Sequence, residues 1–377
     1  MMKLFATAPK GTEGALRDEL RAHRFRHVRA DRGGVHFEGE LIDGARACLL
    51  SRVAMRVQLE IGRFPARGEQ ALYDGVRALD WGPWVSARHT LSVSATCKSS
   101  ALTHSHYIAL KTKDAIVDLV RDREGARPDV DTRRPDVSVI VRLVKDEAVV
   151  YLDLAGDPLH RRGYRVAMRE AVMKENLAAA VILLSGWTPE HPFHDPMCGG
   201  GTLPIEAAMI ARRIPPGLKR SFGVERSPAW DESNRRAWRA LREDARAQVL
   251  PRSPSPIVAS DGVKAAVEAA TENVRAAGLS DTVDVRHLDA RTLTMEHPGT
   301  WFFGDPPYGD RTAVKPLQLM GFFRQLGQTL KGMKGATAVF ISGTDLLAKN
   351  LGLTPDMEHS LWNGDIPCKL LRYRIDP

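Results

Sequence analysis

A proline-rich corner at residues 305–308 directly follows an apolar run and carries groups that could act on a nucleobase amine. Such an amine is a poor nucleophile because its lone pair is delocalised into the ring. The Asp305 carboxylate and the Pro306 carbonyl could accept its hydrogens and keep that pair on nitrogen, while the ring of Pro307 restricts the backbone. Tyr308 could stack on a flipped base, a contact worth ~1–3 kcal/mol. The corner predicts an amine clamp, with an ordinary strand-to-turn corner as the alternative.

Aspartates also stand at the ends of the predicted strands that precede this corner. In an open α/β sheet, ligands bind beyond the carboxyl ends of the strands. Asp261 is placed to accept both hydroxyls of a ribose, Asp289 to accept from an adenine amino group, and Asp195 to hold the loop or receive an ammonium. Together these groups predict a site for S-adenosylmethionine. A helix N-cap is the alternative for Asp195 and for Asp261 taken singly.

Three consecutive glycines, Gly199, Gly200 and Gly201, lie between the first predicted strand and helix of this region. They would let backbone approach a ligand closely. Pro204 stands where a dinucleotide motif needs its third glycine, and no G-K-[ST] follows, so neither an NAD motif nor a P-loop is present. Pro204 fits the first turn of a helix, where its missing amide costs nothing.

The composition describes a globular protein with an excess of basic residues. The 377 residues are 43% hydrophobic, which suits two to three domains at roughly 150 residues each. The longest apolar stretches fall short of the ~18 residues of a membrane span, and a cytoplasmic location is expected. The four cysteines form no CxxC pair, and the histidines lack ligand spacing, so no metal site is predicted. A net charge of +8 favours a polyanionic partner, although a bias towards arginine would also produce it.

The pattern of apolar residues changes twice along the chain. Residues 1–62 and 63–160 each predict a small α+β unit, and the second ends in two alternating strands that turn at Lys145–Glu147. Residues 161–377 alternate helices with apolar strands, which is typical of a doubly wound parallel sheet, and include a tryptophan-bearing helix at 228–248. Arginines cluster in two stretches that could contact RNA or form solvated faces, Arg17 to Arg32 and Arg161 to Arg169.

These motifs resemble a known family. The segments "DPMCGGGTLPIEAA", "DPPYGDR" and "LWNGDIPCKLL" are similar to the THUMP-domain class I RNA methyltransferases that modify the guanine exocyclic amine. "GGVHFEG", "YDGVRALDW", "HYIALKTKDAIVD" and "HRRGYR" before "KENLAAA" resemble the bacterial large-subunit ribosomal RNA guanine-N2 methyltransferases of the RlmL type. The resemblance implies a ferredoxin-like domain at 1–62, a THUMP RNA-binding domain at 63–160 and a Rossmann-like methyltransferase domain at 161–377.

The resemblance also implies the site residues. Asp305, Pro306, Pro307 and Tyr308 match the catalytic corner of the family. The implied cofactor-binding residues are Asp195, Pro196, Cys198, Gly199, Gly200, Gly201, Thr202, Asp261, Gly262, Asp289 and Ala290. The family usually has asparagine in place of Asp305 and serine in place of Gly200. Some relatives continue into a second methyltransferase domain, which is not expected in this chain.

The resulting expectation is methylation of guanosine N2 in ribosomal RNA, as structured RNA or as a precursor particle. The alternatives are a methyltransferase for transfer RNA guanine or for adenine N6 in DNA, and a non-catalytic RNA-binding assembly factor. The RNA-binding module argues against the DNA substrate, and the complete "DPPYG" argues against a non-catalytic role.

Overall fold

The computed structural model describes residues 1–167, 173–306 and 316–376, which form two compact units. The N-terminal unit holds Met1–Thr7, Arg17–Leu159 and Arg220–Asp244. The C-terminal unit holds Ala8–Leu16, His160–Lys219 and Ala245–Pro377. No helix in the described ranges is long and apolar enough to cross a membrane.

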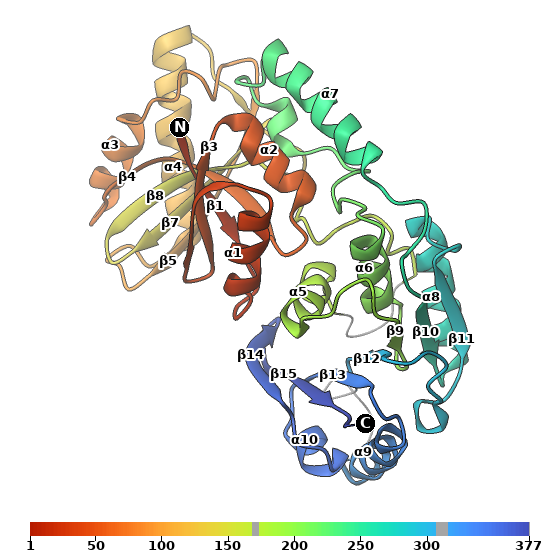
Figure 1. The fold of residues 1–377 in the computed structure, drawn as a ribbon. Helices are drawn as coiled ribbons and strands as arrows, with labels where there is room; N and C mark the ends of the chain where they lie inside the picture. The colour runs from red at the N-terminus through yellow and green to blue at the C-terminus, as the bar shows by residue number, and fades with distance from the viewer. Residues whose placement is uncertain (168–172, 307–315, 377) are drawn as a thin grey trace. The chain divides into compact units, whose positions relative to one another are not determined.

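The N-terminal unit is built on one eight-stranded sheet of order β2-β3-β1-β4-β8-β7-β5-β6 (Figure 1). The strands are β1 (Met2–Thr7), β2 (Arg26–Asp31), β3 (Gly34–Gly39), β4 (Arg56–Pro65), β5 (Thr90–Lys98), β6 (Asp129–Val130), β7 (Val137–Val144) and β8 (Glu147–Asp153). Strand β4 pairs antiparallel with β1 on one side and with β8 on the other. The two parts of the chain that the sequence predicts as separate α+β units therefore share a continuous sheet.

One face of this sheet is apolar and covered by helices. Along β7, the inward residues Val137, Val139, Val141 and Leu143 are buried and alternate with more exposed ones. The helices of this part of the chain are α1 (Glu13–Ala22), α2 (Leu41–Leu50), α3 (Glu69–Arg77) and α4 (Ser105–Glu124). Lys145 and Asp146 both have positive φ, of 53° and 61°, and connect β7 to β8 in a tight hairpin. The hairpin predicted at this point is confirmed.

The segment 220–244 departs from the sequence-based assignment, which places it in the α/β domain. In the structure it belongs to the N-terminal unit. Its short helix η1 (Gly223–Arg226) precedes α7 (Glu232–Ala247), and the Phe222, Trp230 and Trp238 rings pack together with centroids 5.9 and 6.2 Å apart. The Val224 amide donates to the Leu154 carbonyl at 3.0 Å. We attribute the placement of residues 220–244 in the N-terminal unit to burial of this aromatic cluster.

The C-terminal unit has a seven-stranded sheet of order β11-β10-β9-β12-β13-β15-β14. The strands are β9 (Phe193–Asp195), β10 (Ile257–Asp261), β11 (Val283–His287), β12 (Trp301–Gly304), β13 (Thr337–Ser342), β14 (Met357–Asn363) and β15 (Ile366–Arg374). Strands β9 to β13 run parallel, whereas β15 and β14 add an antiparallel hairpin. The helices are α5 (Glu175–Ser185), α6 (Thr202–Ala211), α8 (Lys264–Ala277), η2 (Ala290–Thr292), α9 (Pro316–Lys331) and α10 (Leu346–Leu351). The predicted doubly wound α/β fold is confirmed.

Two packing features stabilise this second sheet. The Phe193 and Phe303 rings stack across β9 and β12 with centroids 4.5 Å apart, and helices α5 and α6 are buried around most of their surface. Residues Ala8–Leu16 lie against the β14–β15 hairpin: Lys10 Nζ stands 3.5 Å from the centre of the Trp362 ring, and His359 Nε2 lies 2.6 Å from the Gly11 carbonyl oxygen. An early stretch of the chain thus belongs to the C-terminal unit.

Candidate cofactor and catalytic site

The parallel strands bring the four predicted aspartates to one edge of the C-terminal sheet. Strands β9 and β10 end at Asp195 and Asp261, Asp305 directly follows β12, and Asp289 follows β11 by two residues. These strands are consecutive in the sheet, in the order β11, β10, β9, β12. From β9 the chain passes to β10 and β11 on one side, and it then returns to β12 on the other side of β9. The carboxyl end of β9 is therefore the switch point of the strand order, where α/β folds bind ligands.

Hydrogen bonds shape the glycine loop between β9 and α6. The Gly199 amide donates to Asp261 Oδ2 at 3.0 Å, and the Cys198 amide donates to the Ser260 carbonyl at 3.0 Å. Gly201, with φ of +79°, begins α6, and a Cβ there would stand 3.3 Å from the Ala270 Cβ. Apart from the two chain neighbours of Gly199, no described residue has an atom within 4 Å of a Cβ built on it. The loop therefore presents backbone to an open space beside the carboxylates.

The electrostatics of this edge favour a cation. Asp195 is 1% exposed, and burial raises its pKa well above the ordinary value, with Asp261 and Asp305 adding like-charge repulsion. The Met197 amide donates to Asp195 Oδ1 at 3.1 Å. Within the described part of the chain, neither Asp195 nor Asp261 forms an ion pair. Burial also raises the pKa of the Cys198 thiol, so Cys198 is no thiolate nucleophile.

Asp289 has a different setting from the other three acids. It caps η2, accepts from the Arg291 amide at 2.9 Å, and receives the Arg291 guanidinium on both oxygens. The Arg291 hydrogen bonds lower its pKa. Ala290 is buried behind it, and a Cβ on Gly262 would stand 3.7 Å from the Asp289 Cα. The ion pair between Asp289 and Arg291 was not predicted from the sequence.

The predicted catalytic corner begins at a crowded glycine. A Cβ on Gly304 would stand 2.8 Å from Met197 Cε and 3.1 Å from the Phe340 ring, so β12 ends in close contact with the loop that follows β9. Asp305 is half-buried and Pro306 is buried. Pro307 and Tyr308 lie outside the described residues. The structure thus brings Asp305 into the group formed by Asp195 and Asp261.

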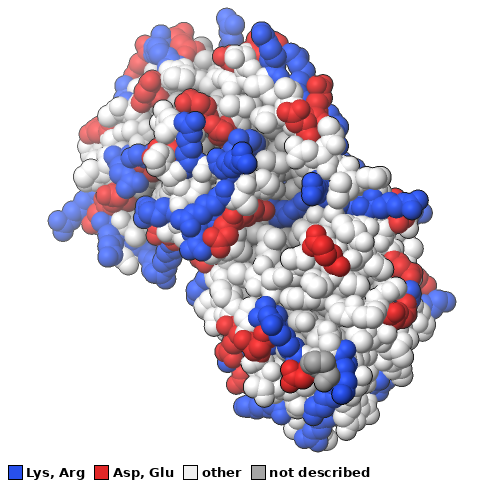
Figure 2. All heavy atoms as spheres, in the orientation of Figure 1, with Lys and Arg blue, Asp and Glu red and all other residues white. Residues whose placement is uncertain are grey.

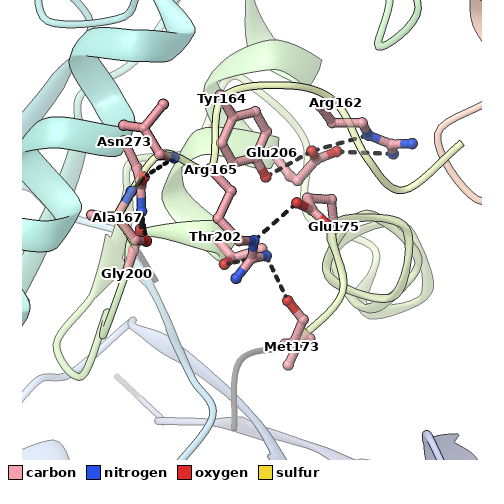
Figure 3. A network of polar contacts seen from close by, with 11 residues as sticks. Arg162, Tyr164, Arg165, Ala167, Met173, Glu175, Gly200, Thr202, Glu206 and Asn273 are labelled. Carbon is pink, nitrogen blue, oxygen red and sulfur yellow. Dashed lines mark hydrogen bonds and ion pairs between the residues drawn. The ribbon is translucent and has the colours of Figure 1, made fainter. Parts of the chain in front are cut away.

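Sequence reasoning missed the network that ties residues 162–167 to this loop (Figure 3). Arg162 and Glu206 form a buried ion pair at 3.3 Å, with side chains 1% and 0% exposed, and the Tyr164 hydroxyl donates to Glu206 Oε1 at 3.1 Å. Arg165 contacts Glu175 at 3.0 Å and Thr202 Oγ1 at 3.2 Å. Two arginines of the predicted basic cluster therefore have structural partners. The single Glu206 in an otherwise apolar helix was the available signal.

Asn273 completes the network from helix α8. Its side-chain oxygen accepts from the Val166 and Ala167 amides at 2.9 and 3.0 Å, and its nitrogen donates to the Gly200 carbonyl at 2.9 Å. Asn273 is 1% exposed. The buried side-chain amide of Asn273 therefore positions both the segment before α5 and the centre of the glycine loop. These residues are too distant in sequence for this contact to be predicted from one chain.

Three family models match consecutive parts of the chain. Residues 3–58 match the RlmL ferredoxin-like domain, residues 66–153 the THUMP domain, and residues 162–372 the RMKL-like methyltransferase domain. Proteins named ribosomal RNA large subunit methyltransferase K/L are similar over nearly the whole chain. That of Pseudomonas putida (strain GB-1) is 36% identical over 387 residues, covering 100% of this chain and 52% of the relative. That of Methylococcus capsulatus is 39% identical over 384 residues, covering 99% and 51%.

Solved structures agree with this picture. The crystal structure of SMU.472 complexed with SAH has a TM-score of 0.92 and 31% identity, covering 100% of this chain and 98% of that one. A structure described as a predicted N6-adenine-specific DNA methylase from Listeria monocytogenes has a TM-score of 0.89 and 30% identity, covering 100% and 96%. The chain spans about half the length of the curated relatives it matches. Because the methyltransferase model matches more than half of the chain, at the residues that build this site, the chain belongs to the RMKL-like methyltransferase family.

Proposed function

We propose that the chain is an S-adenosylmethionine-dependent methyltransferase that modifies guanosine N2 in large-subunit ribosomal RNA, and that it works in the cytoplasm. The names of the curated relatives support the RNA substrate, and the SAH complex of SMU.472 supports the cofactor. Residues 1–62 and 63–160 would grip structured RNA, and residues 161–377 would carry the chemistry. The observation that carries the proposal is the convergence of Asp195, Asp261 and Asp305 at the switch point of the sheet.

The residues present fit this cofactor. S-adenosylmethionine supplies an electrophilic methyl group on a sulfonium, and it carries an ammonium as well. Asp195 and Asp261 offer negative charge without a basic partner among the described residues. Asp261 accepts one hydrogen bond on each oxygen, from the Gly199 amide of the loop and from the Val263 amide, so both oxygens keep a lone pair for ribose hydroxyls. Asp289 would accept from the adenine amino group, and the loop from Pro196 to Thr202 would surround the amino-acid tail.

Asp305 and Pro306 would act on the nucleobase. The Asp305 carboxylate and the Pro306 carbonyl would accept the two hydrogens of the amine and direct its lone pair at the methyl group. Pro307 would restrict the backbone of this pair, and Tyr308 would stack on the base. Asparagine could supply the same acceptor oxygen as Asp305. We assign the acceptor role because proton loss to solvent can follow methyl transfer.

A second candidate is methylation of adenine N6 in DNA. Two observations favour it: Asp305 differs from the asparagine expected for guanine-N2 enzymes, and the Listeria structure is described as an N6-adenine-specific DNA methylase. Both reactions use an exocyclic amine, so the same clamp would serve either base. The THUMP domain match, an RNA-binding module, ranks the RNA substrate first.

The test is methylation of unmodified nucleic acids by the purified chain. In-vitro-transcribed large-subunit ribosomal RNA, transfer RNA and duplex DNA would each be incubated with S-adenosylmethionine and then analysed by nucleoside mass spectrometry. We expect N2-methylguanosine in the ribosomal RNA alone. Methylation of DNA adenine in place of RNA would establish the second candidate, and no product on any substrate would refute both.

Variants of Asp305 test the clamp in the same assay. Asp305→Ala removes one preorganised acceptor and should lower the single-turnover rate by roughly 10²–10³ at saturating cofactor. Asp305→Asn keeps an acceptor oxygen and should retain substantial turnover. Equal and severe loss in both variants would refute the acceptor role, whereas full activity of the alanine variant would refute the clamp.

A further inference from the structure

The N-terminal unit has a large groove on the sheet face opposite its apolar core. We call it the basic groove. It has a volume of ≈ 1280 Å³ and is lined by side chains from β1, β2, β3, β4, β5, β7 and β8, with residues of the adjoining turns. Arg142 of β7 lies on this face because it alternates with the buried Val141 and Leu143. The groove lies within one unit and is built on a continuous sheet, so its walls are rigidly related.

The charge of the basic groove is unbalanced. Its lining holds seven Lys and Arg side chains against four Asp and Glu. Glu60 and Glu147 pair with Arg63, whereas Asp31 and Glu38 contact the imidazole rings of His36 and His27. The lining therefore keeps an excess of three positive charges, seven minus four. Six cations remain that form no ion pair with any residue the structure describes, namely Lys3, Arg29, Arg32, Lys98, Arg142 and Lys145.

Some basic side chains elsewhere in the N-terminal unit are paired. On the side that carries α3 and α4, Arg77 pairs with Asp122 at 2.9 Å and Arg121 with Asp118 at 3.0 Å, whereas Lys111 forms no ion pair with a described residue. Figure 2 shows many Lys and Arg side chains over the N-terminal unit, with acidic side chains between some of them. The basic groove is distinguished by the number of such cations that line one concave surface.

Aromatic rings support the centre of the groove without being open to stacking. The Phe5 ring lies 4.6 Å from the His36 ring and 6.3 Å from the Tyr151 ring, between centroids, and the Arg142 guanidinium stands 5.3 Å above Phe5. Phe5 and Tyr151 are only 2% and 4% exposed. Bases cannot stack on rings that are covered, so a nucleic acid would meet cations here. Contacts between cationic side chains and phosphates do not depend on base identity.

We propose that the basic groove binds the phosphate backbone of the RNA substrate, independently of its sequence; this inference rests on the proposed RNA methylation. Charge complementarity selects a polyanion, and the covered rings select backbone contacts over base recognition. Sequence recognition would then fall to other parts of the chain.

The test is RNA binding by the full chain carrying Arg29→Gln, Arg32→Gln and Lys145→Gln together. All three side chains are exposed, and none forms an ion pair with a described residue. Log affinity falls linearly with log salt concentration, and each lost phosphate contact makes this slope shallower by about one. The triple variant should therefore have a slope whose magnitude is smaller by about three. We expect affinity to fall by about tenfold or more, equally for a large-subunit RNA transcript and an unrelated structured RNA.

A control variant carries the same change of charge outside the groove, at Arg88, Arg121 and Arg127. It should bind RNA with wild-type affinity and slope. Calorimetry with SAH checks both variants for an intact cofactor site, which lies in the other unit. If the groove variant keeps SAH binding and matches the control in RNA affinity and slope, the inference is overturned.

The assay separates this inference from the proposed reaction. If the wild type binds RNA through the groove but methylates none, the reaction is wrong and the binding surface stands. If it methylates RNA while the groove variant binds as the control does, the reaction stands and the groove is not the RNA surface. Loss confined to one RNA sequence would overturn the backbone assignment.

Discussion

Removal of Glu206 should destabilise the C-terminal unit strongly. In the Glu206→Leu variant, the Arg162 guanidinium, 1% exposed in the native chain, loses a carboxylate that it contacts twice at 3.3 Å. Removing one partner of a buried ion pair costs about 3–5 kcal/mol because a desolvated charge remains. The Tyr164 hydroxyl also loses its acceptor, which adds about 1 kcal/mol. We therefore expect a loss of about 4–6 kcal/mol in the free energy of unfolding.

A double variant turns this into a test of mechanism. Arg162→Met with Glu206→Leu removes both charges and leaves apolar side chains of similar size, so it should be more stable than Glu206→Leu alone. Because a chain with two units need not unfold in one step, hydrogen exchange of peptides from β9 and α6 should be followed by mass spectrometry. The reasoning fails if the single variant loses less than about 1 kcal/mol, or if the double variant is no more stable than the single.

Three further outcomes follow from the site. Asp195→Asn should stabilise the cofactor-free chain at neutral pH and weaken binding of the cationic cofactor, as seen by urea unfolding and calorimetry. Burial raises the folded-state pKa of Asp195, so the folded chain binds more protons than the unfolded chain, and the stability of the wild type falls as pH rises above about 4. The stability advantage of Asp195→Asn should therefore grow from pH 4 upwards. A difference that does not change with pH would contradict burial of the Asp195 charge as its cause. Gly201→Ala places a side chain at φ +79° and close to Ala270, so cofactor affinity should fall by about tenfold. Gly200→Ser should bind cofactor nearly as wild type, because a Cβ there meets only Asn273 at 3.4 Å.

Local patterns were sufficient to predict many strands of the two sheets and the parallel core of the second. The alternation along residues 137–144 and the polar turn after it lead directly to the β7–β8 hairpin, and the repeated helix–strand order leads to the parallel sheet. Aspartates at strand ends could be grouped because parallel strands bring their carboxyl ends to one edge. The β14–β15 hairpin was not predicted as strands, although Asn363 and Gly364 mark its turn.

Contacts between distant residues could not be predicted from one sequence. The apolar faces of Phe222 and Trp238 require burial, but nothing local says that the partner is the N-terminal unit. Likewise, the arginines of 161–165 have the composition of an RNA contact, yet Arg162 is neutralised by a glutamate 44 residues later. A cluster of basic residues in a sequence predicts a binding surface only once the acidic residues that pair with them in the fold are known.

The exchange of segments between the two units constrains the order in which this chain can mature during synthesis. The ribosome must release residue 244 before the N-terminal unit has all its parts, and by then β9 and the glycine loop already exist outside the tunnel. The loop at Lys10 and Gly11 obtains its partners Trp362 and His359 later still, because 348 residues separate Gly11 from His359. A truncation after Leu159 would therefore leave the N-terminal unit without the aromatic segment at 220–244 that completes it.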